Sequence, residues 1–396
     1  MVERHGMQVR DIPVAAHRPS ADDRHVPVGG EVMLLEDDLA ADVLGGEWRS
    51  CGHRRQRSEV GALWLSDRRT PRAVGHPGTL AGMLTDRLYV APEVAQAVAD
   101  GRPVVALEST LISHGLPYPA NLEVATASEA AVREHGATPA TVAVHDGRLL
   151  VGLERASLEA LATAPAGSVR KAARPSLAAA IAAGGWAATT VSATMIAAHA
   201  AGIRVFATGG IGGVHRGALG VPGSAAAPTL DISSDLEELG RTPMAVVCAG
   251  PKAILDIPAT LEYLETRGVP VAAVGQAELP GFYARSSGVR APSSVADIAG
   301  AADLVAAHLG LGLGSSVLVC VPVPSDVALP DDVARHAVEQ AIREADEAGV
   351  RGPALTPWLL ARIAVLTDGA SLRANTALIV NDARVAGELA ARLATA

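Results

Sequence analysis

Short runs of small aliphatic residues alternate along the chain with stretches whose apolar positions recur at helical spacing. The runs have the length of buried strands and lie at 104–107, 141–144, 149–153, 203–207, 244–250, 269–274 and 317–320. The helical stretches cover 121–134, 157–162, 176–183, 253–266, 331–348, 357–366 and 372–393. Because buried strands that alternate with helices form parallel sheets covered on both faces, the pattern predicts an α/β protein with three α/β/α layers and a largely parallel sheet. One pair of runs, joined by Asp146-Gly147, is typical of a hairpin.

The first 82 residues lack this periodicity and mix Arg, Asp, Gly and His. We expect 1–82 to be a poorly ordered N-terminal extension, with Met83 as an alternative start; a small accessory domain is the other interpretation. No internal repeat or linker divides 83–396, which predicts a single main domain there.

Composition narrows the function classes. Hydrophobic residues make up 49% of the chain and aromatic residues 3%, so the core should be packed from Ala, Val, Leu and Ile. The formal net charge of -9 argues against a nucleic-acid partner. Three cysteines without CxxC spacing exclude a disulfide scaffold and a zinc module. The apolar span 181–213 is interrupted by Gly184, Gly185, His199 and Arg204, and no signal peptide is recognisable, so we expect a cytoplasmic protein without a membrane partner.

Lysine is almost absent. Of 33 basic residues only Lys171 and Lys252 are lysines, so one of them is a candidate for chemistry that arginine cannot perform, although both can also be ordinary surface residues. A primary amine can attack a carbonyl carbon and form an iminium. Lys252 is the better candidate, because it follows the strand 244–250 and precedes the predicted helix 253–266, at the mouth of the sheet.

Two further segments follow predicted strands. Glu108 ends the run 104–107 and is either a general acid or base, or a turn or capping carboxylate. The Gly-rich stretch 208–217, with His215 and Arg216, is either a phosphate cradle or a flexible turn.

Other polar clusters leave alternatives open. Asp231 and Asp235 flank two serines and suit either a divalent cation or the N-cap of a helix running to Arg241; the spacing alone favours the cap. The loop 285–288 suits an anion or an ordinary turn. Asn375 and Asn381 lie in an apolar helix and need a substrate or another helix as partner.

Seven segments together carry a resemblance. They are VVALESTLISHGLPYPANLE (104–123), GATPATVAVHDGRLLVGL (136–153), TTVSATMIAAHAAGIRVFATGGIGGVHRGA (189–218), DISSDLEEL (231–239), VVCAGPKAILDIPATLEYLETRGVPV (246–271), FYARSSG (282–288) and SLRANTALIVNDARVA (371–386). From about Leu88 to near the C-terminus the chain resembles the pseudouridine-5'-phosphate glycosidase family, also known as pseudouridylate synthases. The resemblance implies a lyase-type glycosidase of pseudouridine catabolism, with 83–396 as its catalytic domain.

The resemblance also implies roles for individual residues. Glu108 matches the proton donor and Lys252 the nucleophile, while Asp231 matches the ligand of one Mn²⁺ ion per subunit, against the cap that spacing favours. The positions that match substrate-binding residues are Lys171, Val191, Ser233, Ser234, Asp235 and Asn375. A homotrimer is the implied assembly, and the implied substrates are small molecules: pseudouridine 5'-phosphate, uracil and ribose 5-phosphate.

The implied reaction explains why an amine is needed. Pseudouridine joins ribose C1' to uracil C5 through a carbon–carbon bond, so protonating a leaving heteroatom, as most glycosidases do, is not available. A lysine that captures C1' as an iminium is the expected route. The alternatives are a Schiff-base lyase or aldolase, or a C-glycosidase, acting on another sugar phosphate, and a non-catalytic nucleotide-binding protein.

Three departures from the family pattern bear on specificity. Lys171-Ala-Ala-Arg-Pro-Ser replaces the usual Lys-x-Ser-Arg-Arg, residues 220–228 form an insertion, and Val321 replaces a usual Asn. We expect the first to loosen contacts around the phosphate, and Val321 to lower activity or shift specificity if the usual Asn orients substrate.

Overall fold

The computed structural model describes residues 86–220, 227–350, 352 and 355–395. All of these residues belong to one unit. The predicted extension 1–82 and residues 221–226 of the insertion lie outside the described residues.

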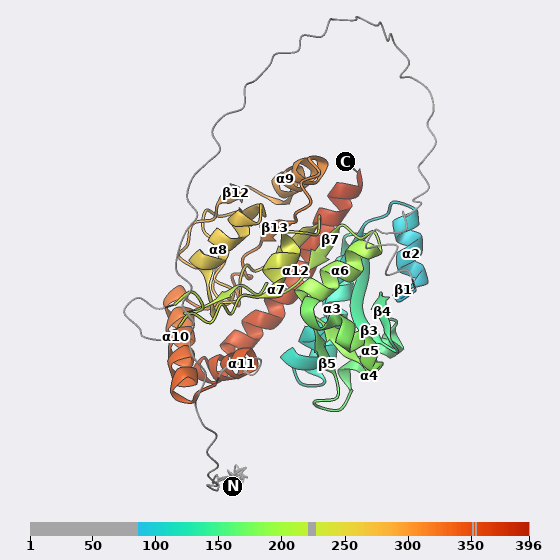
Figure 1. The fold of residues 1–396 in the computed structure, drawn as a ribbon. Coiled ribbons are helices and arrows are strands. Elements are labelled where there is room, and N and C mark those ends of the chain that lie inside the picture. Colours follow the sequence, from blue (N-terminus) through green and yellow to red (C-terminus); the bar gives the residue numbers. More distant parts are fainter. Residues whose placement is uncertain (1–85, 221–226, 351, 353–354, 396) are drawn as a thin grey trace, which may run out of the picture. The chain divides into compact units, whose positions relative to one another are not determined.

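A mostly parallel sheet forms the middle layer (Figure 1). In the described residues it has eleven strands, nine of them in the order β1-β4-β3-β2-β7-β9-β13-β11-β12, with β5 and β6 attached at β3. The strands are β1 Leu88–Val90, β2 Val104–Leu107, β3 Thr138–His145, β4 Arg148–Val151, β5 Arg170–Ala172, β6 Ala187–Thr189, β7 Val205–Ala207, β9 Ala245–Cys248, β11 Val271–Val274, β12 Ser293–Val295 and β13 Val317–Cys320. A separate antiparallel pair joins β8 Val214–His215 to β10 Leu255–Asp256.

Helices cover both faces of the sheet. They are α2 Pro92–Ala99, α3 Ala120–Glu134, α4 Arg155–Ala162, α5 Leu177–Ala183, α6 Val191–Ala200, α7 Ser234–Leu239, α8 Ile257–Thr266, α9 Ile298–Gly310, α10 Asp331–Glu347, α11 Leu355–Leu366 and α12 Ala370–Thr395. A π-helix, η1 Leu111–Gly115, and a 3₁₀ turn, η2 Arg174–Ser176, complete the elements. The predicted three-layer α/β/α fold in one domain is confirmed.

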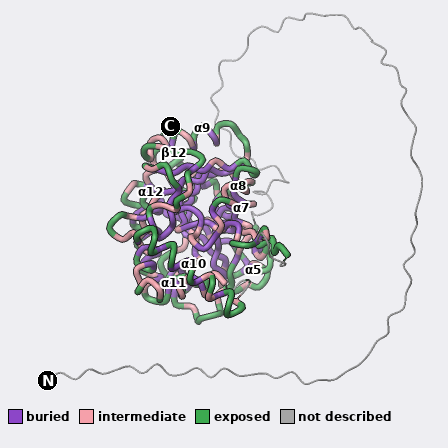
Figure 2. Tube along the Cα trace, turned by 90° about the vertical axis from the view of Figure 1, so that its left-hand side faces the viewer, coloured by how far each residue is buried: buried purple, intermediate pink, exposed green. Residues whose placement is uncertain are grey.

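The alternation of side chains along β2 shows how the layers are held. Val104 and Ala106 pack into the core under α2, α5, α6, α7 and α8, whereas Val105 and Leu107 pack into the core under α3, α9 and α12. Successive residues of a strand point to opposite faces, so a strand buried on both sides is apolar throughout. The buried residues lie along the interior of the unit and the exposed ones around it (Figure 2).

The predicted elements are largely found, and the differences have physical causes. The hairpin is present as β3 and β4, with both Asp146 and Gly147 at positive φ as its turn requires. The helix predicted at 253–266 starts only at Ile257, because Asp256 caps it by accepting a hydrogen bond from Ala259 N at 3.0 Å. Helix α6 was not predicted as a helix, since it is buried on nearly all sides and shows no amphipathic period.

Among the described helices, none alone has the length and apolar character to cross a membrane. The pair α11 and α12 passes by length and composition together, but the two helices meet at a bend of 118°.

Candidate active site

The carboxyl ends of three neighbouring strands carry the polar residues of the central cavity. Glu108 follows β2, Thr208 follows β7, and Lys252 comes shortly after β9. These strands are adjacent and parallel, so the residues that follow them meet at one edge of the sheet. That edge is where open α/β sheets bind ligands.

Two adjoining cavities meet at Glu108 and Lys252. One, of about 120 Å³, has mainly apolar walls and is called the apolar chamber here. The other, of about 150 Å³, contains the N-terminal ends of α6 and α7 and is called the polar chamber. Five residues line both chambers: Glu108, Thr110, Lys171, Lys252 and Thr356. A ligand with one polar and one flat apolar half could therefore place its junction at these side chains.

Glu108 is set up to hold a proton. Burial raises the pKa of its carboxyl group, and this effect outweighs the charge of Lys252 and the hydrogen bond from the Thr208 hydroxyl, both of which lower the pKa. Glu108 and Lys252 both line the two chambers. A carboxyl group with a raised pKa is suited to general acid and base chemistry near neutral pH.

Lys252 is held by its backbone and leaves its side chain available. Its N–H donates to Ile211 O at 3.2 Å, and its carbonyl accepts from Leu255 N at 3.0 Å. The preceding turn depends on Gly250, whose φ of 85° favours glycine. Within the described residues, no hydrogen bond or ion pair engages the Lys252 amine, which lines both chambers. The backbone thus fixes the position of Lys252, while its amine is available to a ligand.

Lys171 enters from a different part of the sheet. It lies in β5 at the register position of Ala188 in β6. Partial burial, and then the nearby charge of Lys252, lower its pKa, while Glu108 and Asp235 raise it. Two amines beside one chamber create a positive site that an anionic group would relieve.

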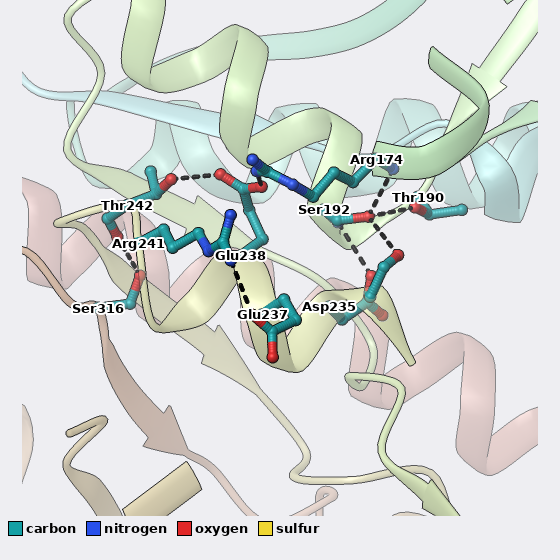
Figure 3. Close-up of polar contacts among 10 residues, drawn as sticks. Arg174, Thr190, Ser192, Asp235, Glu237, Glu238, Arg241, Thr242 and Ser316 are labelled. Atoms are coloured by element: carbon teal, nitrogen blue, oxygen red, sulfur yellow. Dashed lines mark hydrogen bonds and ion pairs between the residues drawn. The ribbon is translucent and has the colours of Figure 1, made fainter. Parts of the chain in front are cut away.

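Asp235 organises the wall of the polar chamber. Its Oδ1 accepts a hydrogen bond from Ser192 N, and its Oδ2 accepts one from Gly212 N, each at 3.0 Å. The side chain is buried, and from α7 it reaches the start of α6, where Ser192 lies (Figure 3), and also the Gly-rich loop. Both oxygens are therefore engaged with backbone amides, and Asp235 shapes the chamber in addition to lining it.

The other predicted substrate-binding residues of this region lie in the same wall. Val191, at the start of α6, is buried and lines the polar chamber. Ser233 and Ser234 are half-buried and line the same chamber. Ser233 is the N-cap of α7: its Oγ accepts a hydrogen bond from Asp235 N at 3.2 Å. The N-cap that the spacing favours in the 231–235 cluster is therefore confirmed, and the residue that forms it is Ser233, not Asp231.

Asp231 is exposed and lines neither chamber. Its carbonyl accepts a hydrogen bond from His215 N at 3.0 Å, which places it beside the polar chamber. Within the described ranges, no three His, Cys, Asp or Glu side chains are grouped so that they could hold a metal ion. The protein donors around Asp231 do not by themselves form a metal centre, so no catalytic step below depends on one.

The two asparagines of α12 have different surroundings. Asn375 lines the apolar chamber, and in the described part of the chain its amide has no hydrogen-bond partner. Asn381 instead accepts a hydrogen bond from Arg384 Nη2 at 3.2 Å. Of the two, Asn375 is the one available to a ligand.

The remaining candidate residues from the sequence lie partly in the chambers and partly outside them. Gly209 and Gly210 line the apolar chamber, Gly212 and His215 the polar one, and Arg216 lines neither. Arg285 donates to Val323 O at 3.0 Å and lies outside both chambers, so the loop 285–288 acts as a turn. Val321 packs in the core under α9 and α12 and likewise contacts neither chamber.

Several lining residues were not identified from the sequence. Thr208 begins the predicted Gly-rich stretch 208–217 but was not singled out within it, and Thr110 follows the same strand end as Glu108; their positions after strands were the available signal. His114 lies in the π-helix η1, and its Nε2 is 3.2 Å from Val169 O. Thr356 comes from α11, far away in sequence, and no local signal indicates it.

Comparisons with known proteins identify the family of the chain. The family described as indigoidine synthase A like protein matches residues 93–392. The pseudouridine-5'-phosphate glycosidase of Paracoccus denitrificans is 54% identical over 308 residues, covering 78% of this chain and 99% of that protein. The one from Caldanaerobacter subterraneus is 51% identical and covers 76% and 95%.

Two solved structures are similar. The prealnumycin C-glycosynthase AlnA, in complex with ribulose 5-phosphate, has a TM-score of 0.69 and 39% identity over 78% of this chain and 97% of its own. An indigoidine synthase A-like protein from Thermotoga maritima has a TM-score of 0.65 and 32% identity over 74% and 94%. These relatives place the chain among enzymes of the C-glycosidase and lyase type. Within that class, the chain belongs to the pseudouridine-5'-phosphate glycosidase family.

Proposed function

We propose that this enzyme reversibly cleaves the carbon–carbon glycosidic bond of pseudouridine 5'-phosphate, giving uracil and ribose 5-phosphate. One observation carries the proposal: Glu108 and Lys252 lie on the wall shared by a polar and an apolar chamber. A sugar phosphate suits the first chamber and a planar base the second, which brings ribose C1' to the shared wall. The names of the relatives support the same substrate.

The proposed chemistry uses Lys252 as the nucleophile. Glu108 gives a proton to the ring oxygen as the bond from that oxygen to C1' breaks, and the Lys252 amine adds to C1' with loss of a proton. The nitrogen lone pair then forms an iminium at C1' as the C1'–C5 bond breaks. The electrons of that bond leave with uracil, whose C5 takes the proton that the amine had passed to the Glu108 carboxylate. Water adds to the iminium, which releases the lysine and the aldehyde of ribose 5-phosphate.

The phosphate provides binding energy away from the reacting bond. Lys171 supplies positive charge, and the N-terminal ends of α6 and α7 supply backbone N–H groups beside it. The base is held in the apolar chamber, where the free amide of Asn375 can hydrogen-bond to its polar edge.

Two further parts of the proposal rest on the family resemblance alone. One Mn²⁺ ion per subunit would be held by Asp231 together with water and substrate oxygens, as hard cations with few protein ligands are. The enzyme would act as a homotrimer. Mass measurement of the native assembly and metal analysis of the purified enzyme test these two points separately.

A second candidate is C-glycoside formation or cleavage with another carbon-linked base. The similarity to a C-glycosynthase favours it over an aldolase, because an aldolase would have no use for the apolar chamber. An assay in the synthetic direction separates the two candidate functions. It measures the rate at which ribose 5-phosphate is joined to uracil and to other planar carbon nucleophiles.

The deciding experiment follows uracil release from pseudouridine 5'-phosphate by the parent, Lys252→Ala and Lys252→Arg. We expect release by the parent alone, and borohydride to fix the pentose phosphate on the parent at Lys252 as a mass adduct. Lys171→Arg is the control for the labelled position, because it keeps the charge and leaves Lys252 as the one lysine of the chain; the adduct should still form. Full turnover by both Lys252 variants would rule out the covalent route, and no uracil from the parent would rule out the reaction.

A further inference from the structure

A buried ion pair lies behind the wall of the polar chamber. Arg174, in η2, reaches Glu238 of α7, whose side chain is only 1% exposed while that of Arg174 is 35% exposed. The Nη1 of Arg174 donates to Oε2 of Glu238, and the Thr242 hydroxyl donates to Oε1 (Figure 3). Both carboxylate oxygens therefore have partners, which a buried charge requires.

The pair anchors the segment that carries Lys171. Arg174 lies three residues after Lys171, and its backbone N–H donates to Ser192 Oγ at 3.1 Å. Upstream, Ala172 O accepts from Thr190 N at 2.8 Å. These two bonds attach the segment to the start of α6, and the Arg174–Glu238 pair is the side-chain link from it to α7. None of the pair's atoms needs to touch a ligand, since neither residue lines a chamber.

The anchor continues away from the site. The Thr242 carbonyl accepts a hydrogen bond from the Ser316 hydroxyl, just before β13, and Ser316 N donates to Leu239 O at 2.7 Å. The C-terminal end of α7 is thereby fixed to the central sheet. Glu238 holds Arg174 against this fixed element, whereas Lys171 itself has no hydrogen-bond or ion-pair partner on its amine within the described residues.

We infer that Glu238 is a positioning residue for the sugar-phosphate half of the substrate, acting through Arg174 to hold Lys171 at the polar chamber. The inference rests on the proposed function only for the identity of the ligand. Glu238 would therefore affect one half of the site only. Its substitution should weaken binding of the sugar phosphate and leave uracil binding and the chemistry at Lys252 nearly unchanged.

The adjacent Glu237 provides a matched control. It lies in the same helix, but it accepts from Arg241 Nη2 at 3.2 Å and also pairs with Arg267 and Tyr263, none of which lines a chamber. Glu238→Gln and Glu237→Gln thus remove the same charge from neighbouring positions that face different surroundings.

The test measures binding of ribose 5-phosphate and of uracil separately by calorimetry on the full chain, together with kcat and KM for pseudouridine 5'-phosphate. We expect Glu238→Gln to weaken ribose 5-phosphate binding about tenfold, a size usual for coupled neighbours, with KM raised and kcat within about twofold of the parent. Uracil affinity should stay the same, and Glu237→Gln should match the parent throughout. Arg174→Gln should repeat the effect, and the double variant should add little to either single change, because both break the same link.

The outcomes distinguish this inference from the proposed function. If the parent binds ribose 5-phosphate but releases no uracil, the proposed reaction fails while the binding comparison still decides the role of Glu238. Unchanged ribose 5-phosphate affinity in Glu238→Gln, or equal losses for both ligands, overturns the inference. If Glu238→Gln does not fold, Arg174→Lys, which keeps the charge but not the forked geometry, gives the same comparison; parent-like sugar-phosphate affinity there also overturns it.

Discussion

The hydroxyl of Thr208 donates a hydrogen bond to the carboxylate of Glu108, although the two residues are 100 positions apart in the chain. Each follows a strand, and the two strands, β7 and β2, are parallel neighbours. The bond therefore fixes the candidate acid relative to the sheet and lowers its pKa against the stronger effect of burial.

Thr208→Val removes this bond with little change of shape. Because the bond lowers the pKa of Glu108, its loss should raise that pKa further, and the alkaline limb of the pH profile of kcat/KM should move to higher pH. At neutral pH we expect a rate loss of about two- to tenfold from the less well oriented carboxyl group. Thr266→Val is the control, since among the described residues the Thr266 hydroxyl bonds only to Glu262 O of its own helix, at 3.0 Å. An alkaline limb at the parent's position would contradict this account.

Asn375→Ala tests the assignment of the apolar chamber to the base. Its amide lines that chamber without a hydrogen-bond partner among the described residues, so its loss should raise KM for pseudouridine 5'-phosphate about tenfold and weaken uracil binding without affecting ribose 5-phosphate. Asn381→Ala, on the same helix but paired with Arg384, should behave like the parent. Loss of sugar-phosphate affinity in Asn375→Ala would show that the halves have been assigned the wrong way round.

Gly212→Ala tests whether the Gly-rich loop depends on close approach. A Cβ at this position would lie 2.8 Å from Asp235 Oδ2 and even closer to Ser233 Oγ, so the loop would have to leave the N-terminal end of α7. We expect activity to fall at least about tenfold, with stability lowered by about 1–3 kcal/mol from strain and the lost Gly212–Asp235 bond. Gly185→Ala, where a Cβ meets nothing within 4 Å, is the control in urea unfolding and activity assays. A fully active Gly212→Ala enzyme would contradict the tight packing.

Asp382→Asn should stabilise the protein at neutral and alkaline pH. Asp382 lies in α12 with 0% exposure, its oxygens lack partners of normal geometry in the described structure, and burial and the nearby Cys248 raise its pKa well above the ordinary value. The backbone N–H of Ala249 only partly offsets this rise. Cys320 is a free cysteine opposite Cys248 in the register of β13 and β9, and its hydrogen bond with Cys248, together with burial, raises its pKa well above the ordinary value.

The direction of the pH dependence of stability follows from proton binding at Asp382. The folded state keeps a proton on Asp382 that the unfolded chain releases above about pH 3.9, so the contribution of this group to stability is most favourable below that pH and falls as pH rises towards the folded pKa. The amide variant lacks this loss, and its free energy of unfolding at pH 7 to 8 should exceed the parent's by about 1–3 kcal/mol. Urea unfolding between pH 5 and 9 measures the difference, with exposed Asp303→Asn as the control. A variant less stable than the parent at pH 8 would contradict a protonated Asp382.

Much of the fold was predictable because its signals are local. The buried runs at β2, β9 and β13 need apolar residues on both faces, and the hairpin turn needs residues that tolerate positive φ at Asp146 and Gly147. Elements with weak local signals were missed. Helix α6 is buried on nearly all sides, and β5 and β6 are only three residues long.

The sequence by itself determined which groups can do chemistry: a carboxyl after the first buried strand of the core and a scarce lysine after another. Their position at strand ends is a consequence of the strand pattern, so their types and approximate place follow without coordinates. Strand order is different, because it is set by packing between segments far apart in the chain. Only the tertiary structure placed β7 between β2 and β9. This order brings Thr208 to Glu108 as a hydrogen-bond donor, and it places Glu108 and Lys252 on a wall that the two chambers share.

The same reason explains the reassigned residues. Whether Asp231, Ser233 or Asp235 caps a helix, faces solvent or holds a loop depends on partners brought in from α6 and the Gly-rich loop. The link from Glu238 to Arg174 likewise joins residues 64 positions apart. Such partners have no sequence signature of their own, because burial and hydrogen bonding are satisfied by whichever groups the folded chain brings within reach.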